Sequence, residues 1–361
     1  MGYIPRMRKF KVYPLILLLS ILVPARSSLA ECFPGEALAR AEWAQFKKPK
    51  VVVIVKPFTN YTKGGGLQWL STGLAELAGS YLTSAKGVGV MYGLMEMFPP
   101  QDVQPIYTVS GTYQITEESI RVYLKTYKAG LEEPFSVEWF SISPPDTALI
   151  FRGMERLIGN FMKKAKLSYN KKVLEAEVTA TQSFDAFSSY IKGLEAMRKF
   201  DPKLIDIAEI WLLDAIKVDP YYQKAYTALT DLYGYLYLEA KAEGRPYDRF
   251  LERLSQFETT RTRFSKRPLP TEDEKPKIIK VEKNPKVTNR FLIGNSNYIA
   301  GLEAMKNGDL KGAAKLLEAA TSAVPEDIVA YRLLRDVYIE LGRKGDADKA
   351  SFMIDTRGIC R

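Results

Sequence analysis

Histidine is absent from the 361-residue chain. Its absence excludes Ser-His-Asp triads, HExxH metalloproteases and His-ligated zinc or haem. Cysteine is nearly absent, because Cys32 and Cys360 are the only two. Two cysteines cannot supply the four thiolates of a zinc site or an iron–sulfur cluster. We therefore expect a non-enzymatic protein with no catalytic residues, no metal ion and no cofactor.

The chain also lacks an apolar run of about 20 residues, the length that a membrane-spanning helix needs. Its longest apolar stretch, Val12–Pro24, follows a basic front and precedes small residues that end at Ala30. This layout is typical of a secretory signal peptide. We expect residues 1–30 to be removed and the mature protein to be exported, to the periplasm. One alternative is an uncleaved membrane anchor. The other is a lipid attached to Cys32, and the charged Glu31 that precedes this cysteine disfavours lipid attachment.

Positive charge exceeds negative charge only moderately, with 52 Lys and Arg against 42 Asp and Glu, or +10. Residues 1–30 hold five basic and no acidic residues, so their removal lowers the net charge to +5. That excess gives no case for a nucleic-acid partner. Export would place Cys32 and Cys360 in an oxidising compartment, where a disulfide between them is one expectation. Two unpaired thiols or a bond between chains are the alternatives.

Strand and helix patterns alternate in the segment that starts at residue 50. Runs of β-branched or alternating apolar residues predict strands, and apolar residues three and four apart predict helices. The predicted strands cover residues 50–58, 87–92, 106–115, 120–127 and 135–142, and the predicted helices cover residues 67–84 and 146–166. This order indicates one sheet with helices on one face.

Three short motifs in this segment resemble the amino-terminal domain of TolB. They are Lys56-Pro57-Phe58 at the end of a strand, TGLAEL at residues 72–77 in a helix, and YTVSGTY at residues 107–113 in a later strand. The resemblance covers residues 50–167. It implies a small mixed α/β domain that binds a partner, and it implies no enzymatic activity.

The second half of the chain contains an internal repeat. YIKGLEAM at residues 190–197 recurs as YIAGLEAM at residues 298–305, with seven of eight residues identical. Gly301, Ala313, Leu317, Ala320 and Pro325 follow the spacing of a tetratricopeptide (TPR) repeat. The first copy follows the same pattern with three extra residues in its turn, and two partial copies come after the prolines at 220 and 325. This part of the chain resembles an all-α TPR solenoid; the alternative is an unrelated bundle of helical hairpins.

We therefore expect a multi-domain α+β protein. Its predicted parts are a signal peptide (1–30), a lead segment (31–49), the TolB-like domain (50–168), a linker (169–183), a first TPR pair (184–242), a helix with a charged Pro/Lys-rich loop (243–292) and a second TPR pair (293–361). The charged loop is either a solvated linker or a docking arm for a partner.

The first helix of each repeat would line the concave face of such a solenoid. The predicted partner-binding residues on that face are Phe187, Tyr190, Lys224, Asp231, Tyr298, Arg332 and Asp336. For Tyr190 and Tyr298 the alternative is packing between helices. TPR grooves, as the resemblance implies, hold peptides or partner helices.

Together these features predict an exported adaptor or scaffold of the bacterial cell envelope, which binds protein or peptide partners through the TPR groove and the amino-terminal domain. The alternative function is an accessory factor of cell-wall or outer-membrane assembly that binds glycan or lipoprotein. Clustered exposed aromatic residues in the groove would favour glycan, whereas alternating charges would favour peptide.

Overall fold

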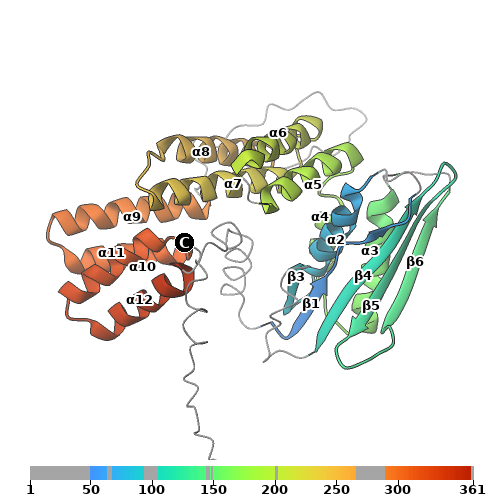
Figure 1. Cartoon of the computed structure of the whole chain (residues 1–361), viewed down its shortest axis with the longest axis horizontal. Helices are drawn as coiled ribbons and strands as arrows, with labels where there is room; N and C mark the ends of the chain where they lie inside the picture. The colour runs from blue at the N-terminus through green and yellow to red at the C-terminus, as the bar shows by residue number, and fades with distance from the viewer. Residues whose placement is uncertain are drawn as a thin grey trace, which may run out of the picture.

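The computed structural model describes residues 49–62, 67–92, 105–143, 147, 149–199, 202–265 and 289–358. Within these residues the chain forms a six-stranded mixed sheet that is followed by a long helical region (Figure 1). This agrees with the predicted α+β class. The predicted signal peptide with its predicted cleavage point at Ala30, both cysteines and most of the charged loop lie outside the described residues.

The strands lie in the order β3-β1-β4-β5-β6, and β2 pairs with one end of β4. β1 is parallel to both β3 and β4, whereas β5 runs antiparallel to β4 and β6. Each predicted strand and both predicted helices of this half are present, with ends that differ by a few residues. The strands are β1 (Val51–Val55), β2 (Thr59–Asn60), β3 (Val88–Tyr92), β4 (Ile106–Ile115), β5 (Ile120–Lys128) and β6 (Ser136–Ile142).

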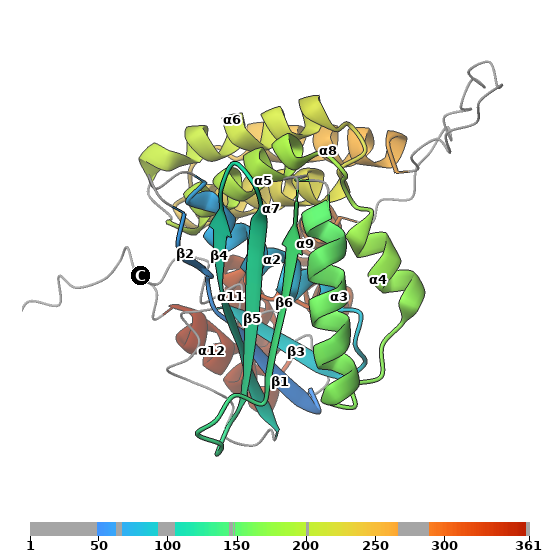
Figure 2. The same cartoon turned by 90° about the vertical axis from the view of Figure 1, so that its right-hand side faces the viewer.

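Helices α2 (Trp69–Leu82) and α3 (Leu149–Lys164) cover one face of the sheet. The alternation of side chains along β5 gives the sheet one apolar face for the helices to cover. Ile120, Val122 and Leu124 are buried against the helices, and the residues between them are exposed. β4, β5 and β6 lie side by side in the foreground of Figure 2, with α2 behind them.

The helical region consists of consecutive helices that pack in pairs. The pairs are α5 (Phe184–Arg198) with α6 (Pro202–Val218), α7 (Gln223–Ala242) with α8 (Asp248–Arg263), α9 (Arg290–Lys306) with α10 (Leu310–Ala323), and α11 (Ile328–Glu340) with α12 (Lys344–Gly358).

Glycine permits a close helix crossing at the same place in two of these pairs. A Cβ atom on Gly193 of α5 would lie 2.7 Å from Leu212 Cγ, and one on Gly301 of α9 would lie 2.9 Å from Leu317 Cγ. Both distances are too short for a real contact between carbon atoms. The internal sequence repeat therefore corresponds to a repeated packing arrangement in the fold.

Residues 169–183 are not the linker that the sequence predicts. They contain helix α4 (Lys171–Val178), whose first turn is capped by Asn170, and whose Leu174 and Val178 are buried. One continuous hydrophobic core runs from β1 through α2 and α4 to α7 and α8, reaching Phe291. A second, smaller core lies among α9 to α12. The sheet and the first two helix pairs therefore share one continuous core, which crosses the predicted boundary between two domains.

Candidate functional site

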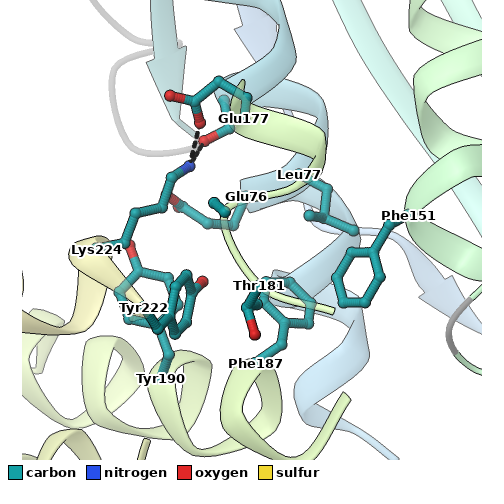
Figure 3. A pocket seen from close by; sticks show the side chains of 11 residues that line it. Glu76, Leu77, Phe151, Glu177, Thr181, Phe187, Tyr190, Tyr222 and Lys224 are labelled. Atoms are coloured by element: carbon teal, nitrogen blue, oxygen red, sulfur yellow. Dashed lines mark hydrogen bonds and ion pairs between the residues drawn. The ribbon is translucent and has the colours of Figure 1, made fainter. Parts of the chain in front are cut away.

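The first two predicted partner-binding residues, Phe187 and Tyr190, are buried between α5 and the sheet half of the protein (Figure 3). The Phe187 ring packs edge-on against Trp69 and Phe151, at centroid distances of 5.8 and 5.4 Å. The Tyr190 ring packs edge-on against Tyr222 at 5.1 Å, and burial raises the pKa of Tyr190 well above its ordinary value. Their predicted position on an open groove is wrong, because this face of α5 packs against α2 and α7.

Polar contacts close the same junction. Lys224 of α7 forms an ion pair with Glu177 of α4 and a hydrogen bond with Ser80 of α2. Thr72 Oγ1 of α2 donates a hydrogen bond to Glu195 of α5, over 2.6 Å. Lys224 therefore joins the helical region to the sheet half, rather than facing an open groove.

The cavity at this junction is too small for a ligand. It has a volume of about 10 Å³, which is the room that one water molecule needs. Binding pockets for small molecules typically enclose hundreds of cubic ångströms. The cavity lining in Figure 3 therefore belongs to the packing of the fold.

Tyr298 is also buried, at a polar contact between the first and second halves of the helical region. Lys241, near the end of α7, places its Nζ atom 2.6 Å from Asp327 Oδ2 and 3.3 Å from the centre of the Tyr298 ring. The side chains of Lys241 and Asp327 are only 3 % and 4 % exposed. Burial lowers the pKa of Lys241, and Asp327 opposes that shift. Tyr298 is therefore a packing residue, as the alternative interpretation had it.

Asp231 lies near a second charged contact, at the start of α9. Arg290 donates two hydrogen bonds to Glu326, over 2.8 and 2.9 Å. Burial disfavours the charge on Arg290, but Glu326, Tyr235 and Asp231 together raise its pKa overall. Asp231 thus contributes to the joint between α7 and α9 and is half-buried there.

Two of the seven predicted residues, Arg332 and Asp336, remain at the surface of the helical region. They lie one turn apart on α11, so they share a face of the helix. Arg332 is half-buried and makes no hydrogen bond or ion pair within the described part of the chain. Asp336 is exposed and accepts two hydrogen bonds from the neighbouring Arg335.

An open depression of about 400 Å³ lies beside α10 and the turn that follows α11. Lys311, Lys315 and Arg343 supply its positive charge, Glu318 lies among them, and Ala314 and Leu341 supply its apolar part. Lys311 and Lys315 are exposed and have no ion-pair partner among the described residues. Sequence reasoning missed this site because it considered only the first helix of each repeat, whereas the depression lies on a second helix and a turn.

No helix among the described residues combines the length and the apolar character that crossing a lipid bilayer requires. Acidic side chains among these residues do not gather in groups of three or more that could hold a metal ion.

No protein-family model matches the chain, and no curated protein matches it. Among solved structures, a protein from Helicobacter pylori described as a neuraminyllactose-binding hemagglutinin homolog is similar to it, with 14 % identity and a TM-score of 0.23. The match covers 37 % of this chain and 91 % of the other.

Proposed function

We propose that this chain is a non-enzymatic adaptor of the bacterial cell envelope, exported to the periplasm after cleavage behind Ala30. In this proposal the sheet half is a TolB-amino-terminal-like domain and the helical region is a TPR solenoid that holds a protein or peptide partner. The repeated crossing of Gly193 with Leu212 and of Gly301 with Leu317 carries the proposal. Paired helices in series with such small-residue crossings are the architecture with which solenoids present extended binding surfaces.

The partner contacts that we propose lie on the last four helices. Arg332 brings to the surface of α11 a cation that has no ion-pair partner among the described residues. Lys311 and Lys315 bring two more to the depression on α10. Cations of this kind gain from pairing with carboxylates of a partner and set the partner's orientation. The partner segment that fits them is an acidic peptide or an acidic helix.

The alternative, an accessory factor that binds glycan in the groove, required exposed aromatic residues there. Phe187, Tyr190 and Tyr298 are buried at 2 %, 6 % and 8 % exposure. The surface that remains on α10 and α11 is charged. This composition favours a protein partner over a glycan for the helical region.

Site-specific photo-crosslinking in the native cell tests the adaptor function. A photoreactive residue replaces Arg332 on α11, Lys315 on α10 or, as a control, Ile210, which is 63 % exposed on the outer helix α6. The proposal predicts one discrete protein adduct shared by positions 332 and 315 and missing at position 210. The absence of any adduct at 332 and 315, or the same adducts at all three positions, would contradict it.

A further inference from the structure

The face of the sheet that is turned away from α2 and α3 carries two exposed aromatic side chains. Tyr123 of β5 and Trp139 of β6 are direct cross-strand neighbours, 39 % and 57 % exposed. Their rings are stacked, with 6.1 Å between the centroids and 25° between the planes. Large aromatic surfaces left in water do not help folding, and grouped exposed apolar surface marks an interaction site.

Two cations flank the aromatic pair. Arg121 and Lys125 lie two residues before and after Tyr123, so all three side chains leave β5 on the same face. Both are exposed, and within the described part of the chain neither has a hydrogen bond or an ion pair. The two positions are about 13 Å apart along the strand. An anionic ligand that lies across the aromatic pair would find a charge partner at either end.

Polar side chains and one apolar residue, Val137 of β6, which pairs with Lys125 and is 53 % exposed, complete this face on the neighbouring strands. Ser110, Thr112 and Gln114 of β4 lie beside Lys125, Tyr123 and Arg121 in register, and Ser141 of β6 lies on the other side of Arg121. We call this set the outer platform: Ser110, Thr112, Gln114, Arg121, Tyr123, Lys125, Trp139 and Ser141. Hydroxyl and amide groups both donate and accept hydrogen bonds. The platform is aromatic at its centre and cationic on two sides, with polar side chains and the exposed Val137 around them.

Other occupants fit the platform less well. A second copy of the chain, packed face to face about a two-fold axis, would bring Arg121 and Lys125 near their own copies, and like charges in an interface are unfavourable. A peptide strand that added to β6 would meet Arg156, whose Nη2 already donates to the Trp139 carbonyl. Proteins that bind single-stranded nucleic acid follow the phosphates with a continuous positive groove, whereas uncharged Tyr123 separates the two cations here.

A sugar ring matches all three parts of the platform. Its C–H face carries partial positive charge and stacks on the electron-rich face of an aromatic ring. Its hydroxyl groups pair with Ser, Thr and Gln side chains. Arg and Lys pair with a carboxylate on the ring through charge-assisted hydrogen bonds. Arg121 and Lys125 thus select an acidic sugar over a neutral one.

We propose that the outer platform binds an acidic oligosaccharide whose sugars carry carboxylate groups, with Tyr123 and Trp139 stacking on the rings and Arg121 and Lys125 pairing with the carboxylates. This activity lies in the sheet half and does not depend on the adaptor role proposed for the helical region.

Titration of the mature full-length protein with defined sugars tests the proposal. The probes are a tetramer of galacturonic acid, a neutral cello-tetramer of the same length and a short oligo-thymidine, each followed by isothermal calorimetry. The proposal predicts binding of the acidic tetramer, at least about tenfold tighter than the neutral one, which corresponds to about 1.4 kcal/mol. No binding of the acidic tetramer at millimolar concentration, equal binding of both sugars, or tighter binding of oligo-thymidine would overturn it.

Three variants locate the binding. Trp139→Ala should weaken binding of the acidic tetramer about tenfold or more, and the double change Arg121→Gln with Lys125→Gln should remove the preference over the neutral tetramer. The control is Tyr61→Ala, which removes an aromatic side chain that is 63 % exposed outside the platform. It should leave binding within about twofold. Because all of these side chains are exposed, thermal melting should stay nearly unchanged. Undiminished binding by Trp139→Ala, or an equal loss in Tyr61→Ala, would refute the placement on the platform.

Discussion

Replacing Lys241 by Met should strongly destabilise the protein. Lys241 and Asp327 are both nearly inaccessible to water, and their charged atoms are 2.6 Å apart. Met keeps the length and apolar stem of the side chain but leaves the Asp327 carboxylate buried without its cation. Breaking a buried ion pair on one side typically costs about 3–5 kcal/mol. The lost contact between Lys241 Nζ and the Tyr298 ring contributes about 2 kcal/mol to that figure.

The partner change is Asp327→Asn, which removes the charge but keeps a side-chain oxygen. That oxygen matters because Asp327 caps α11 and accepts a hydrogen bond from the Ala330 amide over 3.0 Å. The variant should lose about 3 kcal/mol, since Lys241 is left as a buried cation without a counter-charge. The double variant removes both charges, so it should be more stable than the sum of the two single losses predicts, by about 2 kcal/mol.

Denaturant unfolding, followed by circular dichroism and tyrosine fluorescence for the wild type and the three variants, measures these free energies. Additive losses would mean that the two side chains do not interact. A loss below about 1 kcal/mol for Lys241→Met would mean that Asp327 is not buried as the structure places it. Either result would refute the account of how α7 is joined to α11.

Three further predictions concern the fold. Gly301→Leu should cost about 1–3 kcal/mol or more, because the new side chain would collide with Leu317, whereas the control Gly345→Leu, which has open space around it, should melt like the wild type. Stability should fall as the pH rises above 10, because burial raises the pKa of Tyr113 and of Tyr233 to about 12; the unfolded chain then releases protons that the folded chain keeps, and stability is fully present only below 10. An unchanged free energy of unfolding between pH 9 and pH 11.5 would contradict this. Residues 46–168, expressed alone, should be poorly folded, since their core continues into the helices; a cooperative melt of this piece would contradict the shared core.

Local patterns were enough to predict which residues form the strands and that helices cover one face of the sheet. Alternation in IRVYLKTY places Ile120, Val122 and Leu124 on one face, and the structure buries these three. The same alternation contains the signal for the outer platform, because it places Tyr123 between two cations on the opposite, polar face. An aromatic residue in that position is informative, but its partner Trp139 becomes visible only when β6 is paired with β5 in register.

The joint between the sheet and the helices could not be predicted, because its contacts connect residues far apart in the sequence. The aromatic face of α5 was expected to be open, yet Phe187 meets Trp69 of α2. In the sequence, nothing pairs Lys224 with Glu177, which lies 47 residues earlier, yet the two form an ion pair in the fold. Helix α4 did offer a local signal, the capping residue Asn170 ahead of apolar residues at helical spacing.

The adaptor proposal depends most directly on Arg332. Once crosslinking has identified a partner, the decisive measurement is the dissociation constant of that purified partner for the wild type and for Arg332→Glu, taken together with the melting temperatures of both proteins. Arg332 is at the surface and has no ion-pair partner among the described residues, so the change should shift stability by no more than about 0.5 kcal/mol. Reversing a charge that meets an acidic partner should weaken binding about tenfold or more. Equal affinity of the two proteins for the partner would contradict the placement of the binding surface on α11.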